Sequence, residues 1–180
     1  MSRPPRARES VLDAFEAALI DEGARGATMD AVAAAAGVSK GGLLYHYATK
    51  EALEAALIER MRRLVDADVE DMLRSPDGIV SAFVRTSVQS DTPLDRAMVA
   101  TSRLAQTGHD AASVALRDVR RVWEDALRPH TRDESALQLV LLVSDGLYFN
   151  SALATTGVPG PIPQGADLDA LIALVERAAR

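Results

Sequence analysis

The chain has 180 residues, of which 48% are hydrophobic, and its formal net charge is −6 at pH 7. This composition excludes a disordered chain, and the length allows one domain or two small ones. There is no cysteine, which excludes disulfides and cysteine-based metal sites and fits a reducing compartment. No apolar stretch follows the N-terminus, and the longest apolar run, 139–143, is far shorter than the roughly 20 residues of a membrane span. We therefore expect a soluble, cytoplasmic protein.

The acidic excess lies outside the N-terminal part of the chain. Residues 1–50 contain six basic and six acidic side chains, so this segment is neutral. A local group of basic and hydrogen-bonding side chains can bind phosphate while a remote acidic region does not. The negative net charge therefore does not exclude a nucleic acid as partner.

The N-terminal helices are predicted from apolar spacing, helix caps and glycines. Apolar side chains recur at helical intervals from Val11 to Leu19, and Gly23 ends that pattern. Two short helices and one long helix follow, each preceded by a hydroxyl side chain suited to the N-cap: Thr28, Ser39 and Thr49. Gly37 separates the two short helices, and Ser-Pro-Asp-Gly at 75–78 ends the long one.

Five further helices are predicted in the rest of the chain. Their approximate ranges are 78–90, 93–108, 110–128, 133–154 and a final helix capped by Asp167. Thr131-Arg-Asp-Glu134 has the spacing of a capping box at the start of the fourth of these helices. No segment has a convincing strand pattern. The sequence thus predicts an all-α fold with three short N-terminal helices and six longer ones.

Residues 28–51 read TMDAVAAAAGVSKGGLLYHYATKE, a helix, a tight turn and a second helix. The alanines of the first helix allow close packing against the second, and Val38 and Leu43 can close the small core. Such a unit places its second helix in the major groove, where base edges are distinguishable. Side chains that can donate hydrogen bonds to phosphates or bases follow the turn: Ser39, Lys40, Tyr45, His46, Thr49 and Lys50.

Gly41 and Gly42 are unusual inside a helix, where together they cost about 2 kcal/mol relative to alanine. One interpretation is that bare backbone lets the helix approach DNA closely. The other is that this segment is a loose turn.

The segment from Thr28 to Leu53 resembles the DNA-binding domain of the tetracycline-repressor (TetR) family. The matching features are the threonine cap, Gly-Val-Ser at the turn, Leu-x-Tyr-His-Tyr in the second helix and Thr-Lys-Glu-x-Leu after it. An aromatic that is usually phenylalanine is here Tyr47. The resemblance extends back to about residue 8, and beyond residue 55 it is only architectural.

The resemblance implies roles for individual positions. It implies phosphate contacts by Thr28, Tyr45, His46 and Lys50. It places Lys40, Gly41, Gly42 and Leu44 toward the bases. Because two of these four are glycine, direct readout rests mainly on Lys40, which favours guanine, and Leu44, which can touch a thymine methyl. Arg3, Arg6 and Arg8 either reach phosphates or the minor groove or form a disordered tail.

The sequence offers little for catalysis or metal binding. Its three histidines, His46, His109 and His130, have no metal-ligand spacing. No nucleophile motif or phosphate-binding glycine loop is present. We expect no enzyme activity, no metal and no cofactor, with surface or capping roles for the histidines.

The helix at 133–154 is apolar on well over one face, which indicates burial on several sides. Too few other helices remain to cover it, so we expect a second copy of the chain to do so; the alternative is a fully internal helix in a monomer. The candidate dimer contacts are Leu139, Leu142, Val143, Leu147, Leu171 and Leu174.

Polar or aromatic residues within the otherwise apolar helices are candidates for lining an effector pocket, although each alone is more often ordinary core or surface. They are Phe83, Ser87, Met98, Gln106, Trp123, Tyr148 and Asn150. With few aromatics and little concentrated charge, the pattern favours an apolar or modestly polar effector over a large cation.

The sequence therefore predicts a DNA-binding domain at 1–48 and a ligand-binding and dimerisation domain at 49–180. The predicted function is a ligand-responsive repressor that binds a palindromic double-stranded operator as a homodimer. The effector is expected to change the spacing of the two recognition helices through the long helix that starts at Thr49. One alternative is a constitutive repressor whose C-terminal domain only dimerises, and the other is a helical enzyme with a helix-turn-helix-like segment.

Overall fold

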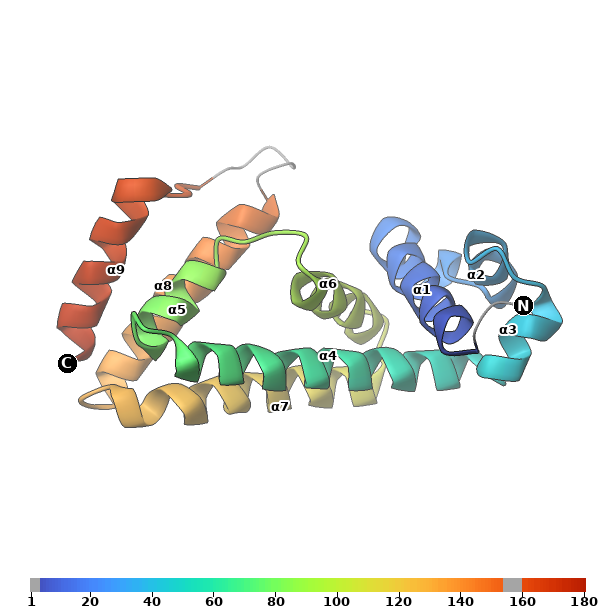
Figure 1. Ribbon diagram of the computed structural model, residues 1–180, viewed down its shortest axis with the longest axis horizontal. Coiled ribbons are helices and arrows are strands. Elements are labelled where there is room, and N and C mark those ends of the chain that lie inside the picture. Colours follow the sequence, from blue (N-terminus) through green and yellow to red (C-terminus); the bar gives the residue numbers. More distant parts are fainter. Residues whose placement is uncertain (1–3, 154–159) are drawn as a thin grey trace. The chain divides into compact units, whose positions relative to one another are not determined.

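Every regular element of the computed structural model, which describes residues 4–153 and 160–180, is helical (Figure 1). These ranges contain nine α-helices and one short 3₁₀ turn, Arg128–His130, and no strand, as the sequence predicted. None of the described helices is long and apolar enough to cross a membrane. Arg3, one of the N-terminal arginines considered for DNA contact, lies outside the described residues.

The chain forms two compact units. Unit 1 comprises Met1–Leu64 and Pro93–Asp118, and unit 2 comprises Val65–Thr92 and Val119–Arg180. Two helices, α4 (Lys50–Arg74) and α7 (Asp110–Leu127), contribute residues to both units. The predicted boundary between residues 48 and 49 separates a DNA-binding from a ligand-binding function rather than two compact units, and it stays a prediction.

Unit 1 contains α1 (Pro4–Gly26), α2 (Met29–Ala35), α3 (Lys40–His46) and α6 (Pro93–Ala105), with parts of α4 and α7. The three predicted N-caps are confirmed. The hydroxyl oxygen of Thr28 accepts the N–H of Ala31 at 3.2 Å, and that of Ser39 accepts the N–H of Gly42 at 3.1 Å. Thr49 caps α4 in the same way through the N–H of Ala52, at 3.2 Å. Each cap satisfies a backbone donor that the helix itself leaves unpaired.

Two glycines with positive φ shape the path of the N-terminal helices. Gly37, at φ +66°, makes the turn between α2 and α3. Gly23, at φ +74°, interrupts α1, and the helix then resumes and ends at Gly26. Glycine enters this region of backbone space without the steric cost of a Cβ. The predicted end of the first helical pattern at Gly23 thus coincides with a real break.

The core of unit 1 is mostly apolar but includes one charged side chain. Its largest fully buried residues on α1 and α4 include Phe15, Leu19, Leu53, Leu57 and Met61. Among them Glu16 of α1 has a side chain only 5% exposed.

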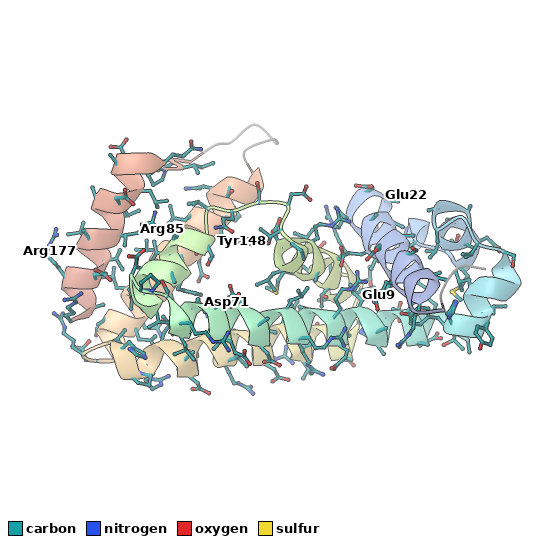
Figure 2. All side chains as sticks on the ribbon, in the orientation of Figure 1. Glu9, Glu22, Asp71, Arg85, Tyr148 and Arg177 are labelled. Carbon is teal, nitrogen blue, oxygen red and sulfur yellow. The ribbon has the colours of Figure 1, made fainter. Side chains whose placement is uncertain are left out.

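Glu16 is held between two arginines from different helices. One of its oxygens lies 3.3 Å from Arg60 of α4, and the other lies 3.1 Å from Arg96 of α6. Arg60 also contacts Asp13 and Glu9 of α1, each at 2.7 Å; Glu9 is labelled in Figure 2. We call these five residues the ion cluster. It connects α1 to α4 and to α6.

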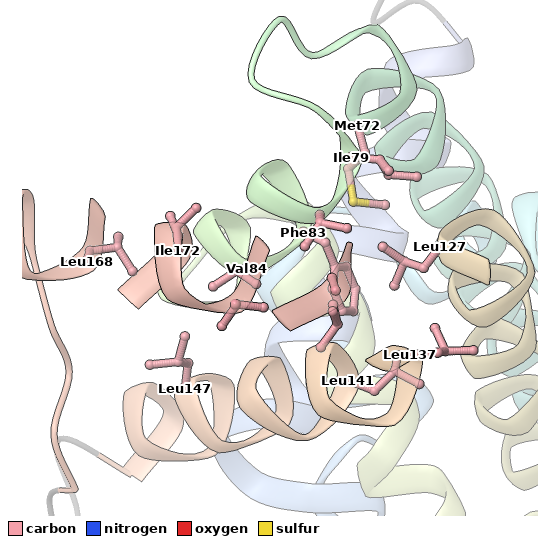
Figure 3. Packing of buried hydrophobic residues seen from close by; sticks show 14 residues of the cluster. Met72, Ile79, Phe83, Val84, Leu127, Leu137, Leu141, Leu147, Leu168 and Ile172 are labelled. Carbon is pink, nitrogen blue, oxygen red and sulfur yellow. The ribbon is translucent and has the colours of Figure 1, made fainter. Parts of the chain in front are cut away.

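Unit 2 contains α5 (Ile79–Thr86), α8 (Glu134–Leu153) and α9 (Gly165–Ala179), which pack against one another, with the ends of α4 and α7. Its core is a cluster of buried apolar side chains that includes Phe83, Leu127, Leu137, Leu141 and Ile172 (Figure 3). Burial of such side chains from water is the main source of folding free energy. Unit 2 therefore has an apolar core of its own.

Two predicted helix starts in unit 2 are wrong in detail. Asp133, not Thr131, caps α8: a carboxylate oxygen of Asp133 accepts the N–H of Ala136 at 2.8 Å, and Thr131 donates instead to the carbonyl of Arg128. The final helix begins at Gly165, so Asp167 lies in its first turn rather than at its cap. Both acidic side chains still lie near the positive end of a helix dipole.

Candidate nucleic-acid interface

The helices α2 and α3 pack through small and apolar side chains. Val32 and Ala33 of α2 and Leu43 of α3 are buried, and Tyr47, directly after α3, completes this core. The segment with two glycines is helical from Lys40 to His46, so the interpretation as a loose turn is wrong. A bond from the backbone N–H of Gly42 to Ser39 supports its first turn. The arrangement is a helix-turn-helix with a short second helix.

The outer face of α3 carries the residues that the sequence assigned to DNA. Tyr45 is 82% exposed and Leu44 is 40% exposed, although both are large side chains. Lys40 and Gly41 are exposed as well, whereas Gly42 and His46 are half-buried. The Tyr45 and His46 rings meet edge to face at 5.2 Å between centroids. The structure thus brings these predicted contact residues together on one short helix.

Lys40 is not a free cation in this structure. Its ammonium lies 2.9 Å from a carboxylate oxygen of Asp30 on α2, and both side chains are largely exposed. Exposed ion pairs contribute little stability, typically about 0–1 kcal/mol, and salt weakens them further. The pair therefore opposes a base contact by Lys40 only weakly.

The resemblance implied a phosphate contact for Lys50, which stays a prediction, and its ammonium has a partner within the chain. Its ammonium donates to the carbonyl of Ala24 at 2.7 Å, and the side chain is half-buried. The bond joins the start of α4 to the end of α1. The two residues are 26 positions apart, so no local pattern in the sequence indicates it.

Tyr47 replaces the usual phenylalanine, and its hydroxyl has a partner. The hydroxyl donates to the carbonyl of Arg8 at 3.5 Å, and the Arg8 guanidinium lies 5.4 Å from the ring centroid. Burial raises the pKa of Tyr47 above its ordinary value, while the nearby Arg8 opposes that rise. The tyrosine thus stays neutral and joins the first turns of α1 to the end of α3.

The seven candidate pocket residues are divided between the two units. Met98 and Gln106 belong to unit 1, and the other five belong to unit 2. Ser87 donates to the carbonyl of Phe83 at 2.9 Å. Asn150 donates to the carbonyl of Pro161 at 3.1 Å, which joins the end of α8 to the segment before α9. These two polar side chains have structural partners.

Phe83 and Trp123 do meet, with ring centroids 6.1 Å apart. The indole N–H of Trp123 donates at 3.0 Å to the carboxylate of Asp68 on α4, a residue that the sequence did not single out. Burial raises the pKa of Asp68, and the neighbouring Asp71 raises it further, while the Trp123 hydrogen bond lowers it. A partly buried carboxylate therefore lies beside an aromatic pair in unit 2.

The candidate dimer residues differ in exposure. Leu142 is 65% exposed, and Leu139 of α8 and Leu174 of α9 are also exposed. Leu147 is instead buried in the core of unit 2, and Val143 and Leu171 pack partly against that core. Phe149 of α8, which the sequence did not single out for this role, is 62% exposed. A shallow, open depression of about 390 Å³ on one face of α8 is lined by Glu134, Ser135, Gln138, Leu139 and Leu142.

No group of three or more histidine, aspartate or glutamate side chains in the described ranges lies close enough together to hold a metal ion. His109 caps α7, because its Nδ1 accepts the N–H of Ala112 at 3.1 Å. Its Nε2 lies 3.2 Å from Glu54 of α4. A capping role for His109 is thus confirmed.

Family models match most of the chain. Residues 11–57 match the bacterial regulatory proteins of the tetR family, and residues 77–176 match the tetracyclin repressor-like C-terminal domain. The chain belongs to the TetR family. It is a transcription regulator with a helix-turn-helix DNA-binding domain, and the first match contains all of α2 and α3. The identification made from Thr28–Leu53 is confirmed.

Solved structures share the fold over nearly the whole chain. A candidate transcriptional regulator from Streptomyces coelicolor A3(2), SCO7518, is 23% identical with a TM-score of 0.65, and the alignment covers 97% of this chain and 99% of that one. GusR of Salmonella enterica is 18% identical with a TM-score of 0.67, and the coverage is 99% and 98%. The multidrug binding protein EbrR, solved with imidazole, is 24% identical with a TM-score of 0.56, covering 96% and 94%.

At these identities the likeness concerns the fold. No curated protein matches the chain. The family and these neighbours are regulators or ligand-binding proteins rather than enzymes.

Proposed function

We propose that the protein is a ligand-responsive repressor that binds a palindromic operator as a homodimer. The observation that carries the DNA-binding part is the outer face of α3, where Tyr45 and Leu44 are large and exposed beside Lys40. Tyr45 and Leu44 are adjacent to Lys40 on one short helix, so together they offer a hydroxyl, an aliphatic group and a cation to a partner. The major groove is such a partner for the second helix of a helix-turn-helix.

The operator test is selection of bound duplexes from a random pool, followed by footprinting. We expect two half-sites with two-fold symmetry, about one helical turn apart or a little more. An unsymmetrical site bound by one chain would contradict the homodimer, and no enrichment of any sequence would contradict the proposed function as a whole.

The proposed contacts are of two kinds: contacts to bases, which give sequence specificity, and contacts to phosphates, which do not. Lys40→Ala should relax the preference at one base pair in each half-site, on a scale of about 1–3 kcal/mol, because a lysine contact to guanine is sequence-specific. Tyr45→Phe should weaken all duplexes alike, since its hydroxyl is proposed to bind phosphate. The same selection with Lys40→Ala measures the first effect, and the affinities of Tyr45→Phe for the operator and for a random duplex measure the second. If Lys40→Ala selects the same sequence motif as the wild type, Lys40 does not contact a base.

The proposed dimer surface lies on α8 and α9. Leu142, Phe149 and Leu174 expose apolar area that water disfavours, and the depression beside Leu139 and Leu142 can accept a side chain from a second copy. Leu142→Glu should convert the dimer to a monomer without unfolding it, because the side chain is already outside the core. Sedimentation velocity measures this. A variant that stays dimeric would place the interface elsewhere.

The proposed effector site is built around Trp123 and Asp68. The carboxylate receives only a neutral donor among the residues described, and it lies beside the Phe83–Trp123 pair. An aromatic pair and a carboxylate together suit a ligand with an apolar body and a polar or cationic group. EbrR has been solved with ethidium as well as with imidazole, which supports ligand binding on this fold.

A thermal-shift screen with neutral, anionic and cationic aromatic compounds tests the effector site. A compound that raises the melting temperature of free protein should also lower operator affinity, by linkage. Trp123→Phe and Asp68→Asn should reduce the response and leave operator binding intact. If no compound stabilises the protein and DNA binding is normal, the constitutive repressor is the better description.

A further inference from the structure

The end of α1, the start of α2 and the start of α4 meet at one corner of unit 1. The backbone of residues 23–28 is fixed there by its own hydrogen bonds, from Ala27 to Gly23 at 3.1 Å and from Thr28 to Gly26 at 2.7 Å. The ammonium of Lys50 donates to the carbonyl of Ala24 at 2.7 Å. Hydrogen bonds within the segment and one hydrogen bond from α4 therefore fix the position of this short segment.

The cations around this corner have partners with one exception. Lys40 pairs with Asp30, and Lys50 binds the Ala24 carbonyl. Arg25 is exposed, and it makes no ion pair or hydrogen bond with any residue of the described ranges. Its guanidinium is thus available to a ligand from outside.

We propose that Arg25 binds a phosphate of the operator backbone and that Lys50 positions it by holding the Ala24 carbonyl. This inference rests on the proposed DNA binding. Arg25 follows Ala24, which contacts the start of α4, and it precedes the N-cap of α2, Thr28, by three residues. Both helix starts belong to the proposed phosphate-binding edge of the helix-turn-helix.

Arginine suits this position for a chemical reason. A guanidinium presents parallel N–H donors that match two phosphate oxygens, and it keeps its charge at all relevant pH values. Lys50 is half-buried, and its ammonium already donates one hydrogen bond to the Ala24 carbonyl. The phosphate contact that the family resemblance assigned to Lys50 is therefore shifted, in this chain, to Arg25.

The salt dependence of binding tests this assignment. Each phosphate neutralised by a cation contributes about 0.9 to the slope of log affinity against log salt concentration. Arg25→Gln should therefore lower the slope by about 2 in a dimer, and it should weaken the selected operator and a random duplex of the same length by the same factor. Arg25→Lys should restore most of the slope, while the melting temperature of both variants stays that of the wild type.

Two further variants make the experiment decisive. Arg103→Gln removes an equally exposed cation from α6, outside α2 and α3, and should leave the slope unchanged. Lys50→Met should lower the melting temperature, because it leaves the Ala24 carbonyl without its donor.

The proposal is overturned if Arg25→Gln keeps the wild-type slope, or if Lys50→Met lowers the slope by about 2 at an unchanged melting temperature. If the wild-type protein binds no duplex at all, the proposed function fails instead.

Discussion

The two compact units are stabilised in different ways. Unit 1 buries Glu16 and binds it with arginines from α4 and α6, whereas the core of unit 2 is a cluster of apolar side chains. Apolar packing is non-directional, but an ion pair with two hydrogen-bonded oxygens requires one arrangement of its helices. Unit 1, which carries the DNA-binding helices, thus adds to its apolar core a buried charged contact that fixes how α1 lies against α4 and α6.

The surfaces of the units differ in a related way. In unit 1 the large exposed apolar side chains include Leu44 and Tyr45 on the proposed DNA face. In unit 2 they include Leu142 and Phe149 of α8 and Leu174 of α9. Unit 1 thus presents a small surface of polar and apolar side chains, which suits the base edges of a DNA groove. Unit 2 presents an apolar surface, which suits a second copy of the chain.

The largest effect is expected from the core of unit 2. Leu141→Ala removes a fully buried side chain and should lower the free energy of unfolding by about 2–5 kcal/mol, through lost burial and the cavity left behind. Urea denaturation followed by circular dichroism measures this loss. A change below about 1 kcal/mol would mean that the site collapses around the smaller residue and that unit 2 depends less on packing than we infer.

A substitution in the ion cluster should cost less stability than Leu141→Ala, but it should weaken operator binding more. Glu16→Gln keeps the shape of the side chain but removes the charge between Arg60 and Arg96, which should cost about 1–3 kcal/mol. Buried ion pairs add little net stability, but removal of one partner leaves the others uncompensated.

Leu141→Ala is the matched control for this change. At a temperature where both variants are folded, Glu16→Gln should weaken operator binding and Leu141→Ala should not. Equal operator affinities would show that the ion cluster does not orient the DNA-binding helices.

A gain in stability is expected at a buried hydroxyl of unit 1. Thr101 of α6 is fully buried, and its Oγ1 has no hydrogen-bond partner in the described parts of the chain. Replacing an unsatisfied polar group by a methyl of similar size avoids its desolvation cost, so Thr101→Val should stabilise the protein by about 1 kcal/mol. Calorimetry would detect this as a higher melting temperature, and a lower one would indicate a hidden partner for the hydroxyl.

The smallest effect is expected from Asp68 and depends on pH. Burial raises the pKa of Asp68, so the folded state binds this proton more tightly than the unfolded state does. Ionised Asp68 therefore lowers stability at neutral pH, and that penalty disappears as pH falls through the raised pKa. Asp68→Asn keeps an acceptor for Trp123, so it should be the more stable protein at pH 7 and lose this advantage in acid. A difference independent of pH would contradict this.

Local patterns predicted much of the fold. Thr28, Ser39 and Thr49 cap helices as expected, because a cap bond spans only three residues. The family resemblance implied outward-facing roles for Tyr45 and Leu44, and both side chains are exposed. The predicted cap at Thr131 was wrong by two positions, because Asp133 makes the equivalent local bond to the N–H of Ala136.

The interactions that the sequence did not predict join distant segments. Arg60 and Glu9 are 51 positions apart, and Trp123 and Asp68 are 55 apart. Arginine and aspartate occur throughout the sequence, and nothing in their spacing selects these pairs. The environment of Lys50 was missed for the same reason. Such contacts depend on how the helices pack, which periodicity alone does not determine.

Gly41 has a consequence for how this protein can change over generations. A Cβ built on Gly41 meets nothing within 4 Å, so the position accepts a side chain without movement of the backbone. Replacement by a residue other than proline also relieves up to about 1 kcal/mol of helix-propensity cost. Because Gly41 is proposed to face the bases, one copy can, after gene duplication, acquire a new base contact by a single substitution here, while the other copy keeps the ancestral operator. The bare position on α3 is a site where two daughter regulators can diverge without passing through an unstable intermediate.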